Sequence, residues 1–263
     1  MTANAPPRSP LVVESLLFAG RLLTHWRRAP TLSIQALLFP TFLLVTYDLL
    51  VGKSMMRITG TDSLYGVVPM CAVAGAMFGA LAAALTIRFE RESGLLSRLW
   101  VLPVNRASAL TGRLLAEAAR TLVGSALITA IGVGLGLRFQ GGWLAVIPFL
   151  LVPVLVGVVF STAVIAIAVR SKSSTSLIWL GVPSIALVFA SSGAPPVELL
   201  PSWIRPLIQL QPMAPTIEFM RALAQGGPAL WPLLLSFGWA LGLAAVVGPL
   251  AVRGYRAAAE SGR

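Results

Sequence analysis

The chain has 263 residues, of which 57% are hydrophobic and only 11% are charged, and its formal net charge is +11. Soluble domains carry about 25% charged residues, so this composition excludes an ordinary soluble protein and predicts an all-α membrane protein. The basic residues form short clusters between apolar runs instead of one continuous stripe, which argues against a nucleic-acid partner.

Residues 11–28 predict an amphipathic helix that lies in the membrane interface. At 100° per residue, its charged and apolar side chains separate onto opposite sides. The polar side contains Glu14, Arg21, His25 and Arg28, and the apolar side contains Val12, Leu16, Ala19, Leu23 and Trp26. We expect Trp26 at the level of the lipid headgroups, with Arg27 directed toward anionic lipid.

Six apolar runs are long enough to cross a bilayer as helices, which requires about 20 residues each. Their apolar residues are continuous and do not alternate, so helices are favoured over the strands of a membrane barrel. The predicted spans cover residues 31–51, 64–87, 107–137, 143–169, 174–192 and 228–252. The whole chain, residues 1–263, is predicted to form one transmembrane domain.

The distribution of basic residues predicts the orientation of these spans. Fifteen Lys and Arg residues lie on the side of both chain termini, and five lie on the other side. Cytoplasmic loops carry the excess of such residues, so both termini are expected in the cytoplasm of a bacterium, with the chain in its plasma membrane.

Two spans contain glycines with the G-x-x-x-G spacing that allows helices to approach closely. These are Gly75 and Gly79 in the second span, and Gly132 and Gly136 in the third. Glycine is also common in membrane helices in general, so the spacing leaves the packing role open.

Ionisable residues lie near the edges of the spans. Asp48 is near the outer end of the first span, and Glu117 and Arg120 lie three residues apart near the inner end of the third. Such residues are candidates for function, but Glu117 and Arg120 also have the spacing of a simple helical ion pair. A proton-driven carrier usually has a charge at mid-membrane, so this pattern argues against that class.

The outer segment 193–227 contains six prolines and is too apolar for a solvated loop. It predicts short re-entrant or interfacial helices that dip back from the outer surface and are shielded by other parts of the protein. An outer gate and a plain hydrophobic cap both fit these residues.

The most highly charged stretch, residues 89–103, follows the second span on the cytoplasmic side. Its sequence FERESGLLSRLWVLP predicts a short helix with charged ends and one apolar ridge, and Pro103 ends this helix. Such a helix suits a groove on a soluble partner, or it lies on the membrane surface. The spacing alone does not decide between the two.

The sequence lacks the motifs of an ATPase or a hydrolase. No phosphate loop of the form G-x-x-x-x-G-K-[ST] occurs, and one His and one Cys cannot build a nucleophilic triad. The chain is therefore predicted not to be an enzyme and to bind no cofactor or metal itself. If it performs work, a separate subunit supplies the energy.

Residues Glu90–Val104, with the sequence ERESGLLSRLWVLPV, resemble the signature loop of type-2 ABC exporter permeases. The usual pattern of that loop is close to E-R-E-x-G-T-x-E-x-L-x-x-x-P-V, and Leu95 and Ser97 replace its usual Thr and Glu. The run LLSRLWVLPVNRAS is particularly similar to the daunorubicin/doxorubicin-resistance membrane subunits of actinobacteria. The likeness extends to six spans, an N-terminal amphipathic helix and outer helices before the last span.

The resemblance implies that residues 89–103 form a coupling helix, which docks on a separate ATP-binding subunit that binds ATP and Mg. The coupling contacts that it implies are Glu90, Arg91, Glu92, Gly94, Leu95, Leu99 and Pro103, with Arg21, Trp26 and Arg27 from the N-terminal helix. A second permease chain, identical or related, is implied as well.

The resemblance and the missing phosphate loop together predict the permease subunit of an ATP-driven exporter. Because no strong charge lines the spans, the expected substrate is a hydrophobic or amphipathic drug or lipid that leaves the cytoplasm or inner leaflet. Two alternatives remain. One is a polysaccharide or teichoic-acid-type carrier of the same superfamily, and the other is a non-transporting membrane scaffold or immunity protein.

Overall fold

The computed structural model consists of helices and their connections throughout the part of the chain that it describes. It describes residues 10–28, 31–60, 62–92, 94, 105, 107–170, 175–189, 191, 201–203 and 205–260. The helices are α1 (Leu11–Arg28), α2 (Thr31–Tyr47), the π-helical turn η1 (Asp48–Gly52), α3 (Lys53–Thr59), α4 (Leu64–Glu92), α6 (Ser108–Leu135), the 3₁₀ turn η2 (Trp143–Ala145), α7 (Val146–Ala168), α8 (Thr175–Phe189), α9 (Arg205–Leu210), α10 (Met213–Gln225) and α11 (Leu230–Glu260). None of the described residues forms a strand, so the all-α fold class is confirmed.

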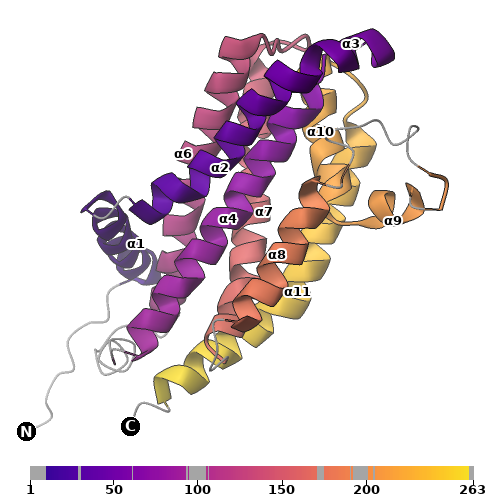
Figure 1. Cartoon of the computed structure of the whole chain (residues 1–263). Coiled ribbons are helices and arrows are strands. Elements are labelled where there is room, and N and C mark those ends of the chain that lie inside the picture. Colours follow the sequence, from indigo (N-terminus) through magenta and orange to yellow (C-terminus); the bar gives the residue numbers. More distant parts are fainter. Residues whose placement is uncertain are drawn as a thin grey trace, which may run out of the picture.

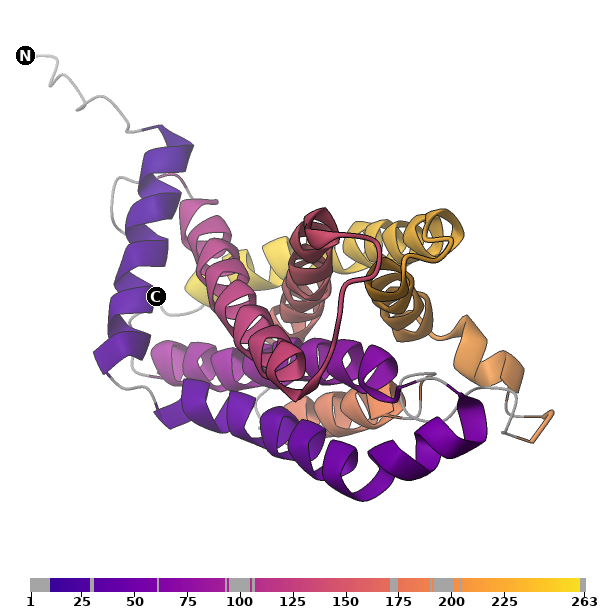
Figure 2. The same cartoon turned by 90° about the horizontal axis from the view of Figure 1, so that it is seen from above.

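The longer helices run side by side as one elongated bundle, as Figure 1 shows. At its centre, α4 packs against α2, α6, α7, α8 and α10, and α7 packs against α4, α6, α8, α10 and α11. Helix α1 lies across the bundle near the end at which α11 finishes (Figures 1 and 2). Its main contact is with the first half of α6, the helix that follows the segment 89–103.

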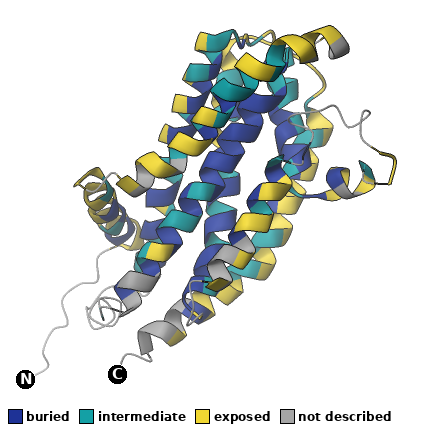
Figure 3. Cartoon of the chain, in the orientation of Figure 1, coloured by how far each residue is buried: buried dark blue, intermediate teal, exposed yellow. Residues whose placement is uncertain are grey.

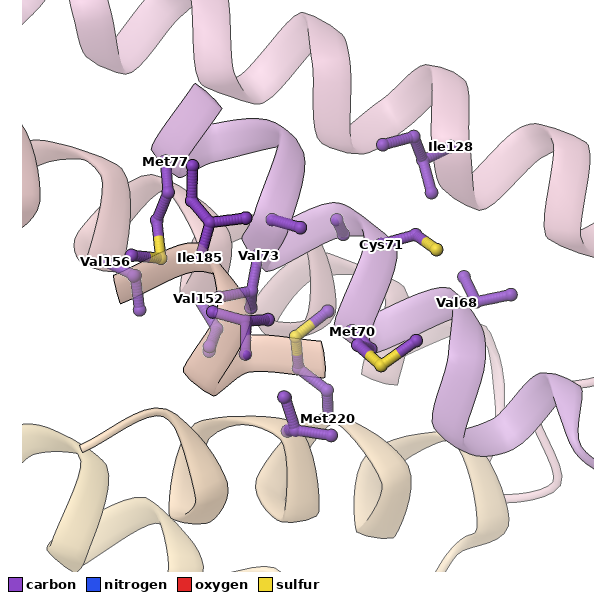
Figure 4. Packing of buried hydrophobic residues seen from close by; sticks show 14 of the residues in the cluster. Val68, Met70, Cys71, Val73, Met77, Ile128, Val152, Val156, Ile185 and Met220 are labelled. Carbon is purple, nitrogen blue, oxygen red and sulfur yellow. The ribbon is translucent and has the colours of Figure 1, made fainter. Parts of the chain in front are cut away.

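The core of the bundle forms around α4. In the most apolar part of α4, 72% is buried inside the protein, whereas in the most apolar part of α11 only 6% is buried. Helix α4 is therefore central and α11 is peripheral. Many alanines and glycines between residues 72 and 84 allow neighbouring helices to approach α4 closely. Figure 4 shows Val73 and Met77 of this helix packed with Val152 and Val156 of α7 and with Ile185 of α8.

Exposed residues cover much of the outside of the bundle (Figure 3), and many of them are large hydrophobic residues. Leu38 and Phe42 of α2 are exposed, and so are Leu241 and Val246 of α11. Soluble monomers rarely expose apolar patches of this extent, so these surfaces are suited to lipid or to another protein chain.

Within the described part of the chain, four helices are long and apolar enough to cross a membrane: Leu64–Ile87, Ser108–Leu135, Trp143–Ala168 and Leu230–Gly254. They correspond to the second, third, fourth and sixth predicted spans. In the region of the first span, α2 ends at Tyr47 and the chain continues into η1. In the region of the fifth, α8 has 15 residues. Such a helix is about 22 Å long, compared with about 30 Å of hydrocarbon core. The number of six spans therefore stays a prediction.

The short helices α9 and α10 belong to the segment that was expected to be re-entrant. Helix α10 packs against α4, α7 and α11, with Ile217 and Met220 buried. Its C-terminal end is tied to the turn between α6 and α7, because the backbone N–H of Gln140 donates to the carbonyl of Ala224 at 2.8 Å. This part of the chain therefore contributes to the core, and its depth in the membrane stays a prediction.

Candidate functional site

Of the predicted coupling residues, Glu90, Arg21 and Trp26 lie where α1, the C-terminal end of α4 and the N-terminal part of α6 meet. Helices α1 and α6 approach closely at Gly112. A Cβ atom added there would lie 2.6 Å from Cβ of Phe18 and 2.7 Å from the backbone oxygen of Ser15. Beside this contact, the hydroxyl oxygens of Ser15 and Thr111 are 2.6 Å apart and share a hydrogen bond. A short contact and a polar bond therefore fix α1 on α6.

Glu14 of α1 is 4% exposed, although it belongs to the predicted polar side of this helix. Its Oε2 accepts a hydrogen bond from the backbone N–H of Asn105 at 2.7 Å. The Asn105 side chain in turn accepts a bond from the N–H of Ala107, at the start of α6. The polar side of α1 thus points partly into the protein, where Glu14 holds the end of the segment that precedes α6.

Glu90 lies near the end of α4 and is also buried, with 9% of its surface exposed. Its carboxylate forms an ion pair with Arg113 of α6, which is 4% exposed. On its other side, Arg21 of α1 lies 3.5 Å away. Arg113 also donates to the backbone carbonyl of Ala83 at 3.4 Å. Through Glu90, charged side chains therefore connect α1, α4 and α6.

These contacts place both ends of the segment 91–104 against the same helix. Arg21 of α1 holds Glu90 at one end, and Glu14 of α1 holds Asn105 at the other. The two holding residues lie seven positions apart, which is about two helical turns, so they share one side of α1. The chain on both sides of this segment is therefore in contact with α1.

The other predicted coupling residues divide into described and undescribed ones. Gly94 has φ = 70°, a left-handed conformation that glycine adopts without strain, and it lies two residues beyond the end of α4. Trp26 packs on a small cluster of α1 and α6 residues, and Arg27 is exposed. The side chains of Arg91 and Glu92, and all of Leu95, Leu99 and Pro103, lie outside the described residues.

A second buried ion pair lies farther along α6. The carboxylate of Glu117, which is 0% exposed, pairs with the guanidinium of Arg120 one turn away. The guanidinium occupies the space beside Gly79 of α4, where any added Cβ atom would overlap with it. Asp48, the other ionisable candidate, lies in the turn η1.

The other three glycines of the predicted packing pairs have different surroundings. A Cβ atom at Gly75 would lie 3.2 Å from Ile128 of α6, and one at Gly132 would lie 2.7 Å from Val68 of α4. Gly136 follows the end of α6 with φ = 128°, a conformation that favours glycine. Gly75 and Gly132 therefore lie at contacts between α4 and α6, and Gly136 terminates a helix.

Replacing Gly112 with alanine is expected to loosen α1 from α6. The added methyl group meets a backbone atom and a Cβ atom below 3 Å, and neither can move by a change of rotamer. We expect a loss of about 1–3 kcal/mol of stability and faster hydrogen exchange of the α1 amides. Gly134→Ala on the same helix is the matched control, because an added Cβ there meets nothing within 4 Å. Equal exchange in the two variants would contradict the close contact.

The described residues contain no group of three or more His, Cys, Asp or Glu side chains that could hold a metal ion. The arrangement of paired charges is suited to a mechanical role. Charged side chains from three helices are paired at one end of the bundle, beside a segment whose two ends they fix.

Comparisons with known proteins identify the family. The model of the ABC-2 family transporter proteins matches residues 53–253. The chain is similar to the probable doxorubicin resistance ABC transporter permease protein DrrC of Mycobacterium tuberculosis, with 36% identity over 248 residues, which cover 94% of this chain and 90% of the relative. No solved structure matches the chain significantly.

Two further relatives are more distant. The daunorubicin resistance ABC transporter permease protein DrrB1 of Streptomyces coeruleorubidus is 27% identical over 256 residues, which cover 95% of this chain and 89% of the relative. The putative transport permease ycf38 of Cyanophora paradoxa is 28% identical over 216 residues, which cover 81% and 74%. Because the family model and the mycobacterial relative both cover most of the chain, this protein is an integral membrane protein of the ABC-2 family of transporters.

Proposed function

We propose that this chain is the permease subunit of an ATP-driven exporter, and that α1 and the segment 89–103 connect it to a separate ATP-binding subunit. One observation carries the coupling role: α1 contacts the chain on both sides of the residues 91–104, at Glu90 through Arg21 and at Asn105 through Glu14. A docking element has to transmit force to the spans, and this arrangement joins it to two of them.

The proposed substrate is a hydrophobic or amphipathic molecule, either a drug or a lipid. The names of the relatives, which refer to doxorubicin and daunorubicin resistance, support a drug. The apolar interior and the few paired charges of the described spans also suit such a substrate better than a free ion or a charged polymer.

In the proposed mechanism, the partner subunits bind ATP and Mg, and their closure pushes on the segment 89–103. The ion pair between Glu90 and Arg113 passes this push to α4 and α6, and α4 is the buried centre of the bundle. A second permease chain, identical or related, completes the path. The complex lies in the plasma membrane of a bacterium, with six spans and both termini in the cytoplasm.

Replacing Leu99 with aspartate is expected to separate the permease from its ATP-binding subunit. A charge on the apolar ridge of the coupling helix removes a central contact of the interface, and such residues contribute about 2 kcal/mol or more. Affinity purification through the permease should then recover at least roughly tenfold less ATP-binding subunit. In proteoliposomes, ATP-dependent movement of daunorubicin should fall in parallel.

The matched control is Leu144→Asp, in an 82% exposed position of the turn η2, at the opposite end of α6 from α1. It introduces the same charge and should leave the association with the ATP-binding subunit unchanged. Wild-type association and export by the Leu99→Asp variant would refute the coupling role. A wild-type complex that binds its ATP-binding subunit but moves none of a panel of amphiphiles would favour the non-transporting scaffold.

A further inference from the structure

A cavity of about 230 Å³ lies between α8 and α11. Helix α8 packs on α4 and α7, whereas α11 packs on α7 and α10, so the two helices leave a space between them that α7 closes from behind. Leu187 of α8 and Trp239 of α11 line this space and are 46% and 40% exposed. The cavity therefore reaches the lateral surface of the bundle, where apolar side chains face outward.

The lining of the cavity is mainly apolar, and none of the described lining residues carries a charge. Two of its hydroxyl groups are already satisfied by the backbone one turn earlier. Thr216 donates to the carbonyl of Pro212 at 3.3 Å, and Ser236 donates to the carbonyl of Pro232 at 2.7 Å. These hydroxyl groups therefore need no further partner.

Gln211 is the exception among the polar lining residues. It lies shortly before α10, it is one of the residues that line the cavity, and only 8% of its surface is exposed. Its backbone is fixed, because its carbonyl accepts a hydrogen bond from the N–H of Ala214 at 3.3 Å. Yet Oε1 and Nε2 of its amide have no hydrogen-bond partner among the described residues. A buried amide in this state is unfavourable, and native proteins rarely retain one without a reason.

We propose that this cavity binds the apolar part of an uncharged amphiphile and that the Gln211 amide hydrogen-bonds a polar group of the bound molecule. An amide presents both a donor and an acceptor, so it suits a hydroxyl or amide group, which presents both as well. A charged group would lose its hydration here without meeting an opposite charge.

The size of the cavity limits what enters it. At about 230 Å³ it exceeds the apolar cavity of about 150 Å³ that is known to hold benzene. It is smaller than the roughly 300–1,000 Å³ of sites that enclose a whole drug-sized ligand. The occupant therefore inserts a ring or a segment of chain through the lateral opening, and the rest of the molecule stays at the surface of the bundle.

The occupant has two possible sources with the same chemistry. If the occupant is an export substrate, the inference rests on the proposed function. If the occupant is a lipid of the bilayer, the inference is independent of the proposed function. The binding experiment below uses the permease without its ATP-binding subunit, so its outcome does not depend on export.

The test uses a monoacylglycerol with a diazirine group in its chain, and as a matched probe the fatty amine with the same chain and diazirine. Purified permease is irradiated with each probe, and the labelled residues are identified by mass spectrometry. We expect the uncharged probe to label residues of α8 and α11 around Leu187, Trp239 and Leu243, and the cationic amine to label them less.

Two variants locate the binding. Ala240→Phe places a ring in the cavity, which Ala240 lines, and should remove this labelling. Gln211→Leu retains the approximate size of the side chain without its amide, and should weaken binding by about tenfold. The control is Gln140→Leu, because the Gln140 amide donates to the Tyr65 hydroxyl at 3.2 Å in an exposed position. It should bind the probe like the wild type.

Gln211→Leu should also unfold at the same temperature as the wild type or a higher one, because it removes an unpaired buried amide. Labelling that is spread over the outside of the bundle, or that survives Ala240→Phe, would overturn the proposal. Labelling that falls in Ala240→Phe but not in Gln211→Leu would overturn the role assigned to Gln211.

Vesicles that also contain the ATP-binding subunit distinguish the two sources. Slower export of the monoacylglycerol by Gln211→Leu would identify the occupant as a substrate, and unchanged export with weaker binding would identify it as a bilayer lipid. Both results support the site. If the wild type exports neither the monoacylglycerol nor daunorubicin with ATP while the labelling stays intact, the result would contradict the proposed function alone.

Discussion

Replacing Arg113 with methionine is expected to lower the stability of the permease strongly and to abolish export. Arg113 is 4% exposed, and its guanidinium pairs with the buried carboxylate of Glu90. Without it, this carboxylate stays in the core, while Arg21 lies on the other side, 43% exposed and 3.5 Å away. Breaking a buried pair by removing one partner typically costs about 3–5 kcal/mol. Thermal unfolding of the purified protein and ATP-dependent transport measure the two effects.

Arg21→Met is the matched comparison, because it removes the same kind of side chain from the same carboxylate at a more exposed position. Exposed ion pairs contribute about 0–1 kcal/mol, so this variant should unfold close to the wild-type temperature. The double variant Glu90→Gln, Arg113→Met should recover part of the lost stability, because no buried charge remains. An Arg113→Met protein that is as stable as Arg21→Met would refute the buried pair.

The fold class and several local features follow from the sequence because they depend on neighbouring residues. Continuous apolar runs indicate helices, and four of these runs form helices that can cross a membrane. The pair between Glu117 and Arg120 was one of two interpretations that their spacing allowed. Interactions within one helical turn are fixed by helix geometry, so the sequence is sufficient to anticipate them.

The coupling site depends on contacts between distant residues, and there the sequence is less informative. The resemblance assigns Glu90 to the contact with a partner, but in the fold its carboxylate is buried against Arg113, 23 positions later. Glu14 reaches Asn105 across 91 positions. Helical periodicity places these side chains on a face of their own helix, but it does not say which helix covers that face.

Small residues show both what the spacing predicts and where it stops. The spacing of Gly75 and Gly79 predicts one close helix contact, and both glycines do face α6, where Gly75 lies beside Ile128 and Gly79 makes room for the guanidinium of Arg120. The spacing does not say which helix lies opposite. Gly112 forms the close approach of α1, and Ala116, four positions later, is fully buried beside the same helix. This small-x-x-x-small spacing was available in the sequence as a signal for the α1 contact.

Replacing Arg120 with leucine is expected to have the second largest effect on stability. Glu117 is fully buried, and its partner Arg120 reaches into the space beside Gly79, between α6 and α4. Loss of the guanidinium leaves a carboxylate in the interior of a helix that can cross the membrane, at a cost of about 3–5 kcal/mol. The variant should therefore unfold at a much lower temperature than the wild type.

The double variant Glu117→Leu, Arg120→Leu separates a structural role of this pair from a role in transport. Replacing both members of a buried pair with apolar residues is often neutral or stabilising, so the double variant should regain most of the lost stability. The coupling energy between the two positions follows from the cycle formed by the double variant, the two single variants and the wild type. Because the pair is satisfied within one helix, we also expect export to return. A double variant that is stable but inactive would show instead that these charges take part in transport. A single variant Arg120→Leu with wild-type stability would refute the buried pair itself.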